Sequence, residues 1–284
     1  MKVIEVINKG KTTISFEFFP PKTVEQEARL FAALDELKAY HPDFASITCG
    51  AMGTNRDKTL DWAKVIKQHG VDPVVHLTCI AETKEIILNQ LKEMKNLGIE
   101  NILALRGDAP VDQGLGTGEF SYASDLVTFI KKQAPEFCLG VAGYPEKHPQ
   151  CASLEDDINH LKTKVDAGAD YIITQLFFDN KYYFNFVDHC RQVGIKVPVI
   201  PGIMLITSLK QLKKMTEVCG AIIPTELLAR LEAADGDNQL VQQIGIEHAV
   251  QQCRELIKSK VPGLHFFVMN QAGPVKRVLQ SLKV

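Results

Sequence analysis

Polar and ionisable residues recur near the ends of six short hydrophobic segments in the first two thirds of the chain. They are Glu17 in SFEFFPPK, Thr48 in SITCG, His76 in VHLTC, Arg106 and Asp108 in LRGD, Tyr144 in GYPEKHP and Gln175 in ITQLFFD. Carboxylate, imidazole, guanidinium and amide groups transfer protons and hold charged or hydrogen-bonding ligands. If the segments are parallel strands of one barrel, these side chains share one rim. The pattern therefore predicts a single site assembled from several strands.

Glu17 is a candidate general acid because Phe16, Phe18 and Phe19 flank it. Loss of solvation among aromatic rings raises a carboxyl pKa and suits the group to donate a proton. The alternative is that Glu17 points into the barrel and pairs with an arginine or lysine. His76 has two readings as well: a satisfied core histidine, which is the more common role on an apolar strand, or a contact to a cofactor.

The segment after Asp108 runs to about Phe120 and is long for a strand–helix connection. Its glycines are not followed by Lys-Ser/Thr and lack the dinucleotide-binding spacing, which favours a plain or mobile loop over a phosphate cradle. Further along, Asp157 and Lys164 lie two helical turns apart and share a face. That face could hold hydroxyls and a phosphate, or it could be a solvated ion-pair surface.

The elements that must position these groups alternate along the chain. The expected strands are Thr13–Phe19, Asp43–Thr48, Pro73–Cys79, Asn101–Arg106, Phe137–Gly143, Tyr171–Gln175, Val197–Pro201 and Gly263–Met269. The expected helices are Glu25–Tyr40, Arg56–His69, Thr83–Leu97, Tyr122–Gln133, Leu154–Ala167, Lys181–Val193, Leu209–Val218, Asn238–Lys260 and Gly273–Leu282. Eight strand–helix units predict an α/β fold, a (β/α)8 TIM barrel, with an extra helical insert around Pro224–Ala233 before the eighth strand. A doubly wound sheet is the alternative.

Composition narrows the class of protein. Thirty-two Lys+Arg against 34 Asp+Glu give a net charge of −2, which does not favour a nucleic-acid partner. The longest apolar run, Val197 to Ile206, is too short and too interrupted to span a membrane, and we find no secretory signal. The seven cysteines are odd in number and lack C-x-x-C spacing, so we expect reduced thiols in the cytoplasm and no metal site.

The chain resembles the bacterial 5,10-methylenetetrahydrofolate reductase family, whose members bind FAD. The matching segments are SFEFFPPK (15–22), SITCGAMG (46–53), VHLTC (75–79), LRGD (105–108), YASDLV (122–127), GYPEKHP (143–149), KVDAGAD (164–170), ITQLFFD (173–179) and PGI (201–203). They occur in family order and cover essentially the whole chain. The resemblance implies one catalytic barrel over residues 1–284, without the regulatory domain that larger relatives append.

The resemblance also implies a reaction. NAD(P)H would reduce FAD and leave, and 5,10-methylenetetrahydrofolate would take its place and be reduced to 5-methyltetrahydrofolate, in ping-pong order. Glu17 would protonate N10 of the folate, and Asp108 would stabilise the cationic iminium. The implied FAD-binding residues are Thr48, Cys49, Ala51, His76, Arg106, Gly107, Asp108, Tyr122, Ala123, Tyr144, His148, Asp157, His160 and Lys164. The implied folate or nicotinamide contacts are Gln175, Gln211 and Gln271.

Some positions depart from the family pattern. Cys49 stands where an aromatic residue is frequent, His160 and Thr163 stand where relatives more often have asparagine and a basic residue, and Gln271 replaces an arginine that serves the folate tail. Relatives are often homo-oligomers, and we expect one here. Two alternatives stay open: a reductase subunit of the same family that takes electrons from a partner flavoprotein or ferredoxin, and a non-catalytic barrel that binds FAD or folate.

Overall fold

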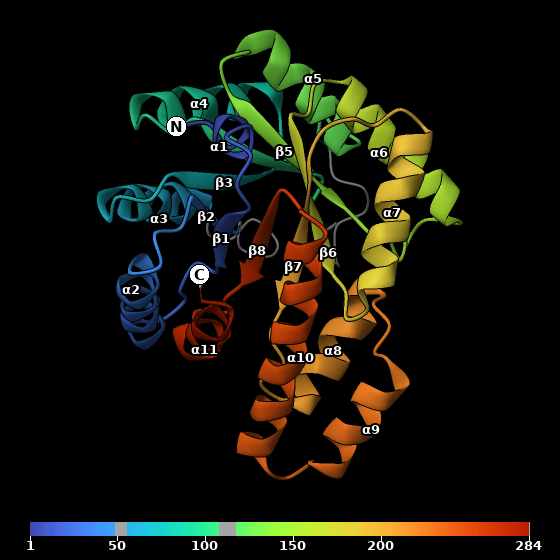
Figure 1. The fold of residues 1–284 in the computed structure, drawn as a ribbon. Coiled ribbons are helices and arrows are strands. Elements are labelled where there is room, and N and C mark those ends of the chain that lie inside the picture. The colour runs from blue at the N-terminus through green and yellow to red at the C-terminus, as the bar shows by residue number, and fades with distance from the viewer. Residues whose placement is uncertain (49–55, 108–117, 284) are drawn as a thin grey trace.

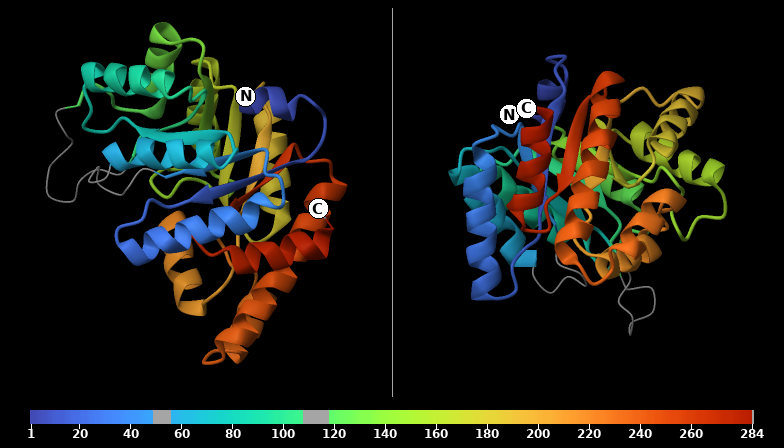
Figure 2. Two further views of the ribbon diagram at one scale, coloured as in Figure 1. Left: turned by 90° about the vertical axis from the view of Figure 1, so that its left-hand side faces the viewer. Right: turned by 60° about the horizontal axis from the view of Figure 1, so that its bottom comes forward.

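A closed barrel of eight parallel strands forms the centre of the protein (Figures 1 and 2). The computed structural model describes residues 1–48, 56–107 and 118–283, so Cys49, Ala51 and Asp108 lie outside the described residues. The strands are β1 (Thr13–Phe18), β2 (Phe44–Ile47), β3 (Pro73–Thr78), β4 (Asn101–Leu105), β5 (Cys138–Gly143), β6 (Tyr171–Leu176), β7 (Val199–Met204) and β8 (Gly263–Phe267). β1 pairs with β8, with Thr13 opposite Gly263, and this pairing closes the barrel. The TIM barrel predicted from the sequence is confirmed.

Helices surround the strands and connect each to the next (Figure 2). They are α2 (Val24–Lys38), α3 (Arg56–Gln68), α4 (Lys84–Asn96), α5 (Ala123–Gln133), α6 (Leu154–Asp166), α7 (Asn180–Gln192), α8 (Leu209–Cys219), α9 (Thr225–Ala233), α10 (Asn238–Lys258) and α11 (Ala272–Leu282). Several begin at side-chain caps: Thr23, Thr83, Ser153 and Ser208 each accept a hydrogen bond from the backbone N–H three residues on. These caps fix where each loop ends and therefore how it meets the rim.

The helical insert before β8 is confirmed as α9. Together with α8 and α10 it extends below the barrel in Figure 1. Leu227 and Leu231 of α9 are buried against Leu212 of α8 and Val241 of α10, and they form a second hydrophobic core beside the main one. This core fixes α8 relative to β7, which positions the residues at the start of α8.

Two features differ from the sequence-based prediction. A short helix, α1 (Val3–Ile7), precedes β1; its Val3 and Ile7 pack against residues at the amino ends of the strands, such as Phe44 and Tyr171, and so cover that end of the barrel. Five residues are too few to show a helical period. In addition, β7 covers Val199–Met204, whereas the sequence predicted Val197–Pro201. The strand continues past Pro201 and Gly202, and its pairing with β6 shifts register there.

Candidate active site

The Glu17 side chain lies inside the barrel and is only 6% exposed. Its Oε2 atom lies 3.3 Å from Nε2 of His265 on β8 and 3.3 Å from Nε2 of His76 on β3. The hydroxyl of Ser46, on β2, donates to the same oxygen at 3.2 Å. One carboxylate oxygen therefore collects contacts from three other strands.

His265 is held at both ring nitrogens. Its Nδ1 lies 2.8 Å from the hydroxyl of Ser15, and its Nε2 lies within 3.4 Å of both Glu17 and the Ser46 hydroxyl. The ring stacks on Phe44 with centroids 6.0 Å apart, and the side chain is fully buried. We call Ser15, Glu17, Ser46, His76 and His265 the Glu17 cluster; its buried polar atoms can store and pass a proton.

The electrostatics of Glu17 correct the expectation from its neighbours in the sequence. Burial alone would raise the pKa of Glu17, but the charge on His76 and the hydrogen bond from His265 lower it to well below its ordinary value. The phenylalanines do not control this group, because adjacent residues of a strand point to opposite faces and Phe16 and Phe18 pack in the core outside the barrel interior. Glu17 does point into the barrel, as the alternative expected. Its partners there are two histidines and not the arginine or lysine that the alternative named.

A second group of predicted residues gathers where the ends of β4 and β5 meet α6. Lys164 on α6 donates from Nζ to the carbonyl of Ala142 at 2.6 Å, and burial lowers its pKa to about 8. Arg106, which follows β4, donates from Nη2 to Oε1 of Gln150 at 2.7 Å. These oxygens carry no net charge, so an anionic group such as a phosphate would stabilise both cations.

The loop after β5 is fastened to α6. The backbone N–H of His148 donates to Oδ2 of Asp157 at 2.9 Å, and the rings of Tyr144 and His148 meet edge to face with centroids 4.6 Å apart. Asp157, His160 and Lys164 follow one another at spacings of three and four residues, so they share one side of the helix. We call these three residues the α6 face; the structure brings this predicted group together.

Other predicted cofactor residues also lie on the carboxyl side of the strands. Gly107 has φ +86°, and a Cβ there would come within 3.0 Å of the Thr78 side chain, so the tight turn after β4 requires glycine. The N–H of Thr48, directly after β2, donates to the carbonyl of Phe18. Tyr122 and Ala123 lie at the start of α5, where Tyr122 is 62% exposed. None of the contacts found within the described residues joins these four to the Glu17 cluster.

The three predicted substrate residues occupy three different places at the same end of the barrel. Gln175, on β6, turns its Oε1 back to the N–H of Leu176 at 2.9 Å. Gln211 lies in the first turn of α8, where its Oε1 accepts from the Thr207 hydroxyl. Gln271 precedes α11 and is exposed. The structure does not bring these glutamines into contact with one another.

Three residues that the sequence did not predict belong to the Glu17 cluster or contact the loops beside it. Ser15 has the same orientation as Glu17, two residues along β1, and this spacing could have revealed it. His265 lies in the apolar run GLHFF. A histidine in an apolar strand is only weak evidence, from sequence alone, that the residue belongs to a site. Asn270, after β8, donates to the carbonyl and accepts from the N–H of Phe19, at 2.8 and 3.0 Å. It therefore ties the loop after β8 to the segment that follows β1.

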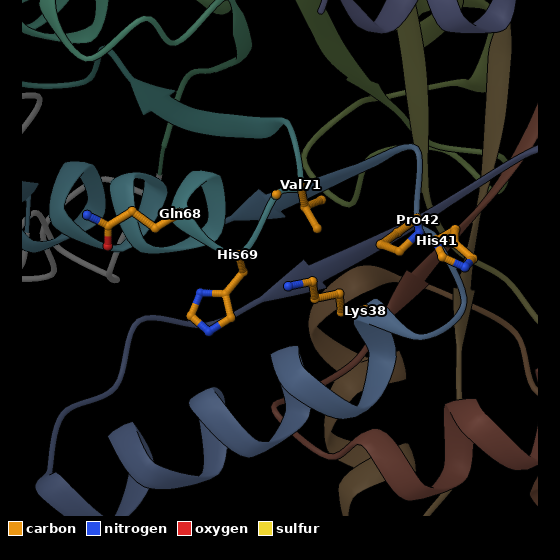
Figure 3. Close-up of a pocket in the computed structure, with 7 residues that line it drawn as sticks. Lys38, His41, Pro42, Gln68, His69 and Val71 are labelled. Atoms are coloured by element: carbon orange, nitrogen blue, oxygen red, sulfur yellow. The ribbon is translucent and has the colours of Figure 1, made fainter.

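Figure 3 shows a basic pocket outside the candidate site. It has a volume of about 300 Å³ and is lined by Lys38, His41, Pro42, Gln68, His69, Gly70 and Val71. These residues belong to the turns that lead from α2 into β2 and from α3 into β3, which is the amino end of the strands. Since the ligands of TIM barrels bind at the carboxyl end, this pocket is separate from the candidate site.

Among the residues that the structure describes, no three His, Cys, Asp or Glu side chains gather as they would around a metal ion. Across the same ranges, no helix has the length and apolar character needed to cross a membrane.

Comparisons with known proteins point to one family. The family model for methylenetetrahydrofolate reductase matches residues 2–283. The 5,10-methylenetetrahydrofolate reductase of Escherichia coli K12 is 40% identical over 97% of this chain and 92% of its own. A methylenetetrahydrofolate reductase (NADH) of Zea mays is 39% identical over 99% of this chain, but the chain spans about half of that protein's length.

A solved structure supports the fold. A Clostridium thermocellum protein, described as binding two copies of 5-methyl-5,6,7,8-tetrahydrofolic acid, superposes with a TM-score of 0.68 at 15% identity and covers 98% of this chain. At that identity the likeness bears on the fold alone. The family model and the bacterial relative extend over nearly the whole chain, and on that basis the protein is a member of the methylenetetrahydrofolate reductase family.

Proposed function

We propose that the protein reduces 5,10-methylenetetrahydrofolate to 5-methyltetrahydrofolate with hydride from NAD(P)H, in ping-pong order and with FAD as the bound cofactor. The observation that carries the proposal is the Glu17 cluster, a buried carboxylate held by two histidines in a chain of this family. Two imidazoles and the Ser46 hydroxyl lie within 3.3 Å of its Oε2 atom, and Ser15 contacts the far nitrogen of His265. Groups of this kind can take up and deliver a proton.

The residues that follow the carboxyl ends of β4 and β5, together with the α6 face, fit FAD. Its pyrophosphate is a dianion, and Lys164 and Arg106 supply two cations, which donate hydrogen bonds to the Ala142 carbonyl and the Gln150 amide oxygen. Lys164 also interacts electrostatically with Asp157. The Asp157 carboxylate, which accepts one hydrogen bond from the N–H of His148, can also accept from hydroxyls. When bound, FAD would carry hydride from the nicotinamide to the folate. Thr48, His76, Gly107, Tyr122, Ala123, Tyr144 and His160 are proposed to line the same site, together with Cys49 and Ala51.

Glu17 is proposed to deliver the proton that opens the folate ring at N10. Because the resting carboxyl is ionised, the proton must first move onto Oε2, and the neighbours positioned to supply it are Nε2 of His265 and of His76. The Ser15 hydroxyl contacts the other ring nitrogen of His265, Nδ1, and so holds the ring in place. The Glu17 cluster as a whole therefore acts as the general acid. Glu17 is the residue of the cluster that contacts the substrate and passes the proton to it.

The remaining residues complete the proposal. Asp108 would place a negative charge beside the cationic iminium of the folate, which stabilises that cation and so favours opening of the folate ring. Gln175, Gln211 and Gln271 would contact the folate or the nicotinamide. A cytoplasmic location is supported by seven cysteines without C-x-x-C spacing, and a homo-oligomer rests on the resemblance alone.

An anaerobic optical experiment tests this proposal. The protein, reconstituted with FAD, should absorb near about 450 nm, bleach with NADH and regain its colour when methylenetetrahydrofolate is added. Glu17→Gln should bleach normally and regain colour at least about 100-fold more slowly, whereas Glu25→Gln, an exposed control, should behave as the wild type.

The outcomes separate the candidate functions. A protein that cannot be reconstituted with FAD would overturn the proposal. Bleaching that needs a partner flavoprotein or ferredoxin would favour the alternative electron donor. Normal bleaching without any folate-dependent recovery in the wild type would favour a non-catalytic barrel. Loss of both half-reactions in Glu17→Gln would make Glu17 a structural residue.

A further inference from the structure

Cys151 lies in the loop between β5 and α6 and is partly exposed. Its Sγ lies 3.8 Å from Nδ1 of His160, on the second turn of α6. A thiol within reach of an imidazole can pass its proton to the ring and react as the thiolate. The chain therefore places a nucleophile beside a base.

A lysine and the amino end of a helix lie close to the backbone of Cys151. Lys147 donates from Nζ to the carbonyl of Cys151 at 2.5 Å, so its ammonium is fixed at the backbone of the same residue. Cys151 also lies two residues before Ser153, which caps the amino end of α6, where the helix dipole favours a negative charge.

Three acidic residues face the same helix end and oppose the thiolate: Glu155, Asp156 and Asp157. Two of these carboxylates accept hydrogen bonds from neighbouring residues. Asp156 accepts from the Ser153 hydroxyl at 2.7 Å, and Asp157 accepts from the N–H of His148 at 2.9 Å. These carboxylates keep their charge and disfavour the thiolate, so the reactivity proposed here depends on His160, whose Nδ1 contacts the sulfur.

The other described cysteines have different surroundings. Cys79, Cys138, Cys190 and Cys253 are buried, and burial raises the pKa of Cys79 and Cys190 to about 12. Cys219 is partly exposed, as Cys151 is, but it is the last residue of α8, and burial raises the pKa of its thiol to about 11. Cys219 is therefore a matched control for exposure without a neighbouring base.

We propose that Cys151 exchanges with small disulfides, and that the resulting adduct obstructs the α6 face. The Cys151 thiol gives its proton to His160, and the sulfur attacks one sulfur of the disulfide RSSR. A Cys151–S–SR bond forms, the S–S bond of RSSR breaks, and RS⁻ leaves and takes up the proton as RSH. The added group then sits against His160, next to Asp157 and Lys164. The obstruction rests on the proposed function, since it is the FAD site that the adduct would cover.

The first arm of the test measures the thiol itself and needs no cofactor. The protein is incubated near neutral pH with 2-hydroxyethyl disulfide, and the rate at each cysteine is followed by peptide mass spectrometry. Cys151 should react at least about tenfold faster than Cys219, and a reduced thiol should reverse the adduct. His160→Asn should slow the reaction at Cys151 by at least about threefold and leave Cys219 unchanged. Equal rates at the two cysteines, or no effect of His160→Asn, would overturn the proposal.

The second arm measures FAD affinity by quenching of flavin fluorescence. The adduct should weaken FAD binding at least about tenfold, while Cys151→Ser treated in the same way should keep the affinity of the reduced protein. Unchanged affinity in the adduct would overturn the obstruction. If the reduced wild type fails to bind FAD, the proposed function fails, and the rates of the first arm still decide whether Cys151 is the reactive thiol.

Discussion

The Nε2 atom of His265 lies 3.3 Å from Oε2 of Glu17 across the seam where β8 meets β1. In the register of this seam Ser15 is opposite His265 and Glu17 is opposite Phe267, so the imidazole contacts Ser15 directly and Glu17 on the diagonal. The two residues are 248 positions apart in the chain. Their contact exists only in the closed barrel, and the proton-moving part of the site therefore depends on closure.

Replacing His265 with glutamine should raise the pKa of Glu17. The imidazole stabilises the carboxylate by a hydrogen bond and by its charge when protonated, and a neutral amide supplies no charge. The carboxyl stretching band of Glu17, isolated by subtracting the infrared spectrum of Glu17→Gln, should titrate at a higher pH in the His265→Gln protein.

The control for this variant is His189→Gln, since His189 lies exposed on α7 and bonds only locally, to the carbonyl of Asn185. It should leave the Glu17 band unchanged. A midpoint that stays in place or falls in His265→Gln would mean that His265 does not set the charge state of Glu17.

Glu146 should make the stability of the protein depend on pH near neutrality. Its Oε1 accepts from the N–H of Ile222, and burial raises its pKa to about 7, with Asp179 adding to the rise. The folded state therefore binds the proton more tightly than the unfolded state, whose glutamate titrates near about 4.3. Stability should be highest below the unfolded pKa and should fall as pH rises through 7, by about 1–3 kcal/mol in all.

Urea unfolding at a series of pH values tests whether the free energy of unfolding falls as the pH rises. Glu146→Gln cannot ionise, so its free energy of unfolding should lose this fall between pH about 4.5 and 7.5. Glu155→Gln, an exposed variant on α6, should follow the wild type. A wild-type stability that instead rises with pH over this range, with the rise absent in Glu146→Gln, would contradict the direction of the shift.

The sequence predicted the barrel well because the information is local. Strand and helix periods, with glycine at turns such as Gly107, place Glu17, Arg106 and Gln175 at the carboxyl side of their strands without knowledge of the rest of the chain. The α6 face could also be predicted, since spacings of three and four residues within one helix need no tertiary contact.

The charge state of Glu17 could not be predicted in this way. Its neighbours in sequence are Phe16 and Phe18, which point away from it, while its partners in space, His76 and His265, come from β3 and β8. A pKa depends on what lies within a few ångströms, and that depends on which strands meet. The α1 helix was missed for a related reason, because Val3 and Ile7 are stabilised by the ends of distant strands.

Asn270→Ala should destabilise the protein, whereas Gln271→Ala should not. Asn270 bridges both backbone groups of Phe19, and removing its side chain leaves those partly buried groups without their partner, at a cost of about 1–3 kcal/mol. Gln271 is exposed, and its only hydrogen bond among the described contacts comes from its backbone N–H to Val268, which alanine keeps. Gln271→Ala should change the free energy of unfolding by no more than about 0.5 kcal/mol.

Urea unfolding gives both values, and the optical assay adds a second readout. If Gln271 contacts the folate, Gln271→Ala should slow recovery of the flavin colour without changing stability. Equal loss of stability in the two variants would show that the Asn270 bridge does not hold the loop.

Gly202→Ala should destabilise the barrel where β6 meets β7. A Cβ at this position would overlap the carbonyl oxygen of Thr174 and come within 2.8 Å of the Phe267 ring, so the backbone of β6 would have to move. The same glycine donates its N–H to the Thr174 hydroxyl at 2.9 Å, and this bond would be stretched. Overpacking of this kind costs about 1–3 kcal/mol. Because Gln175 follows Thr174, the displacement should also slow recovery of the flavin colour by folate, and bleaching by NADH as well if Gln175 contacts the nicotinamide.

The matched variant is Gly273→Ala in the first turn of α11, where a Cβ would meet nothing within 4 Å and the backbone is helical. Alanine is the better helix former, so this change should leave the stability equal or raise it by up to about 1 kcal/mol. Thermal unfolding of the two variants beside the wild type separates a steric effect from a general intolerance of losing glycine. Equal melting temperatures for Gly202→Ala and the wild type would mean that β6 and β7 can separate without loss, and Gly202 would then have no role in holding Gln175 at the site.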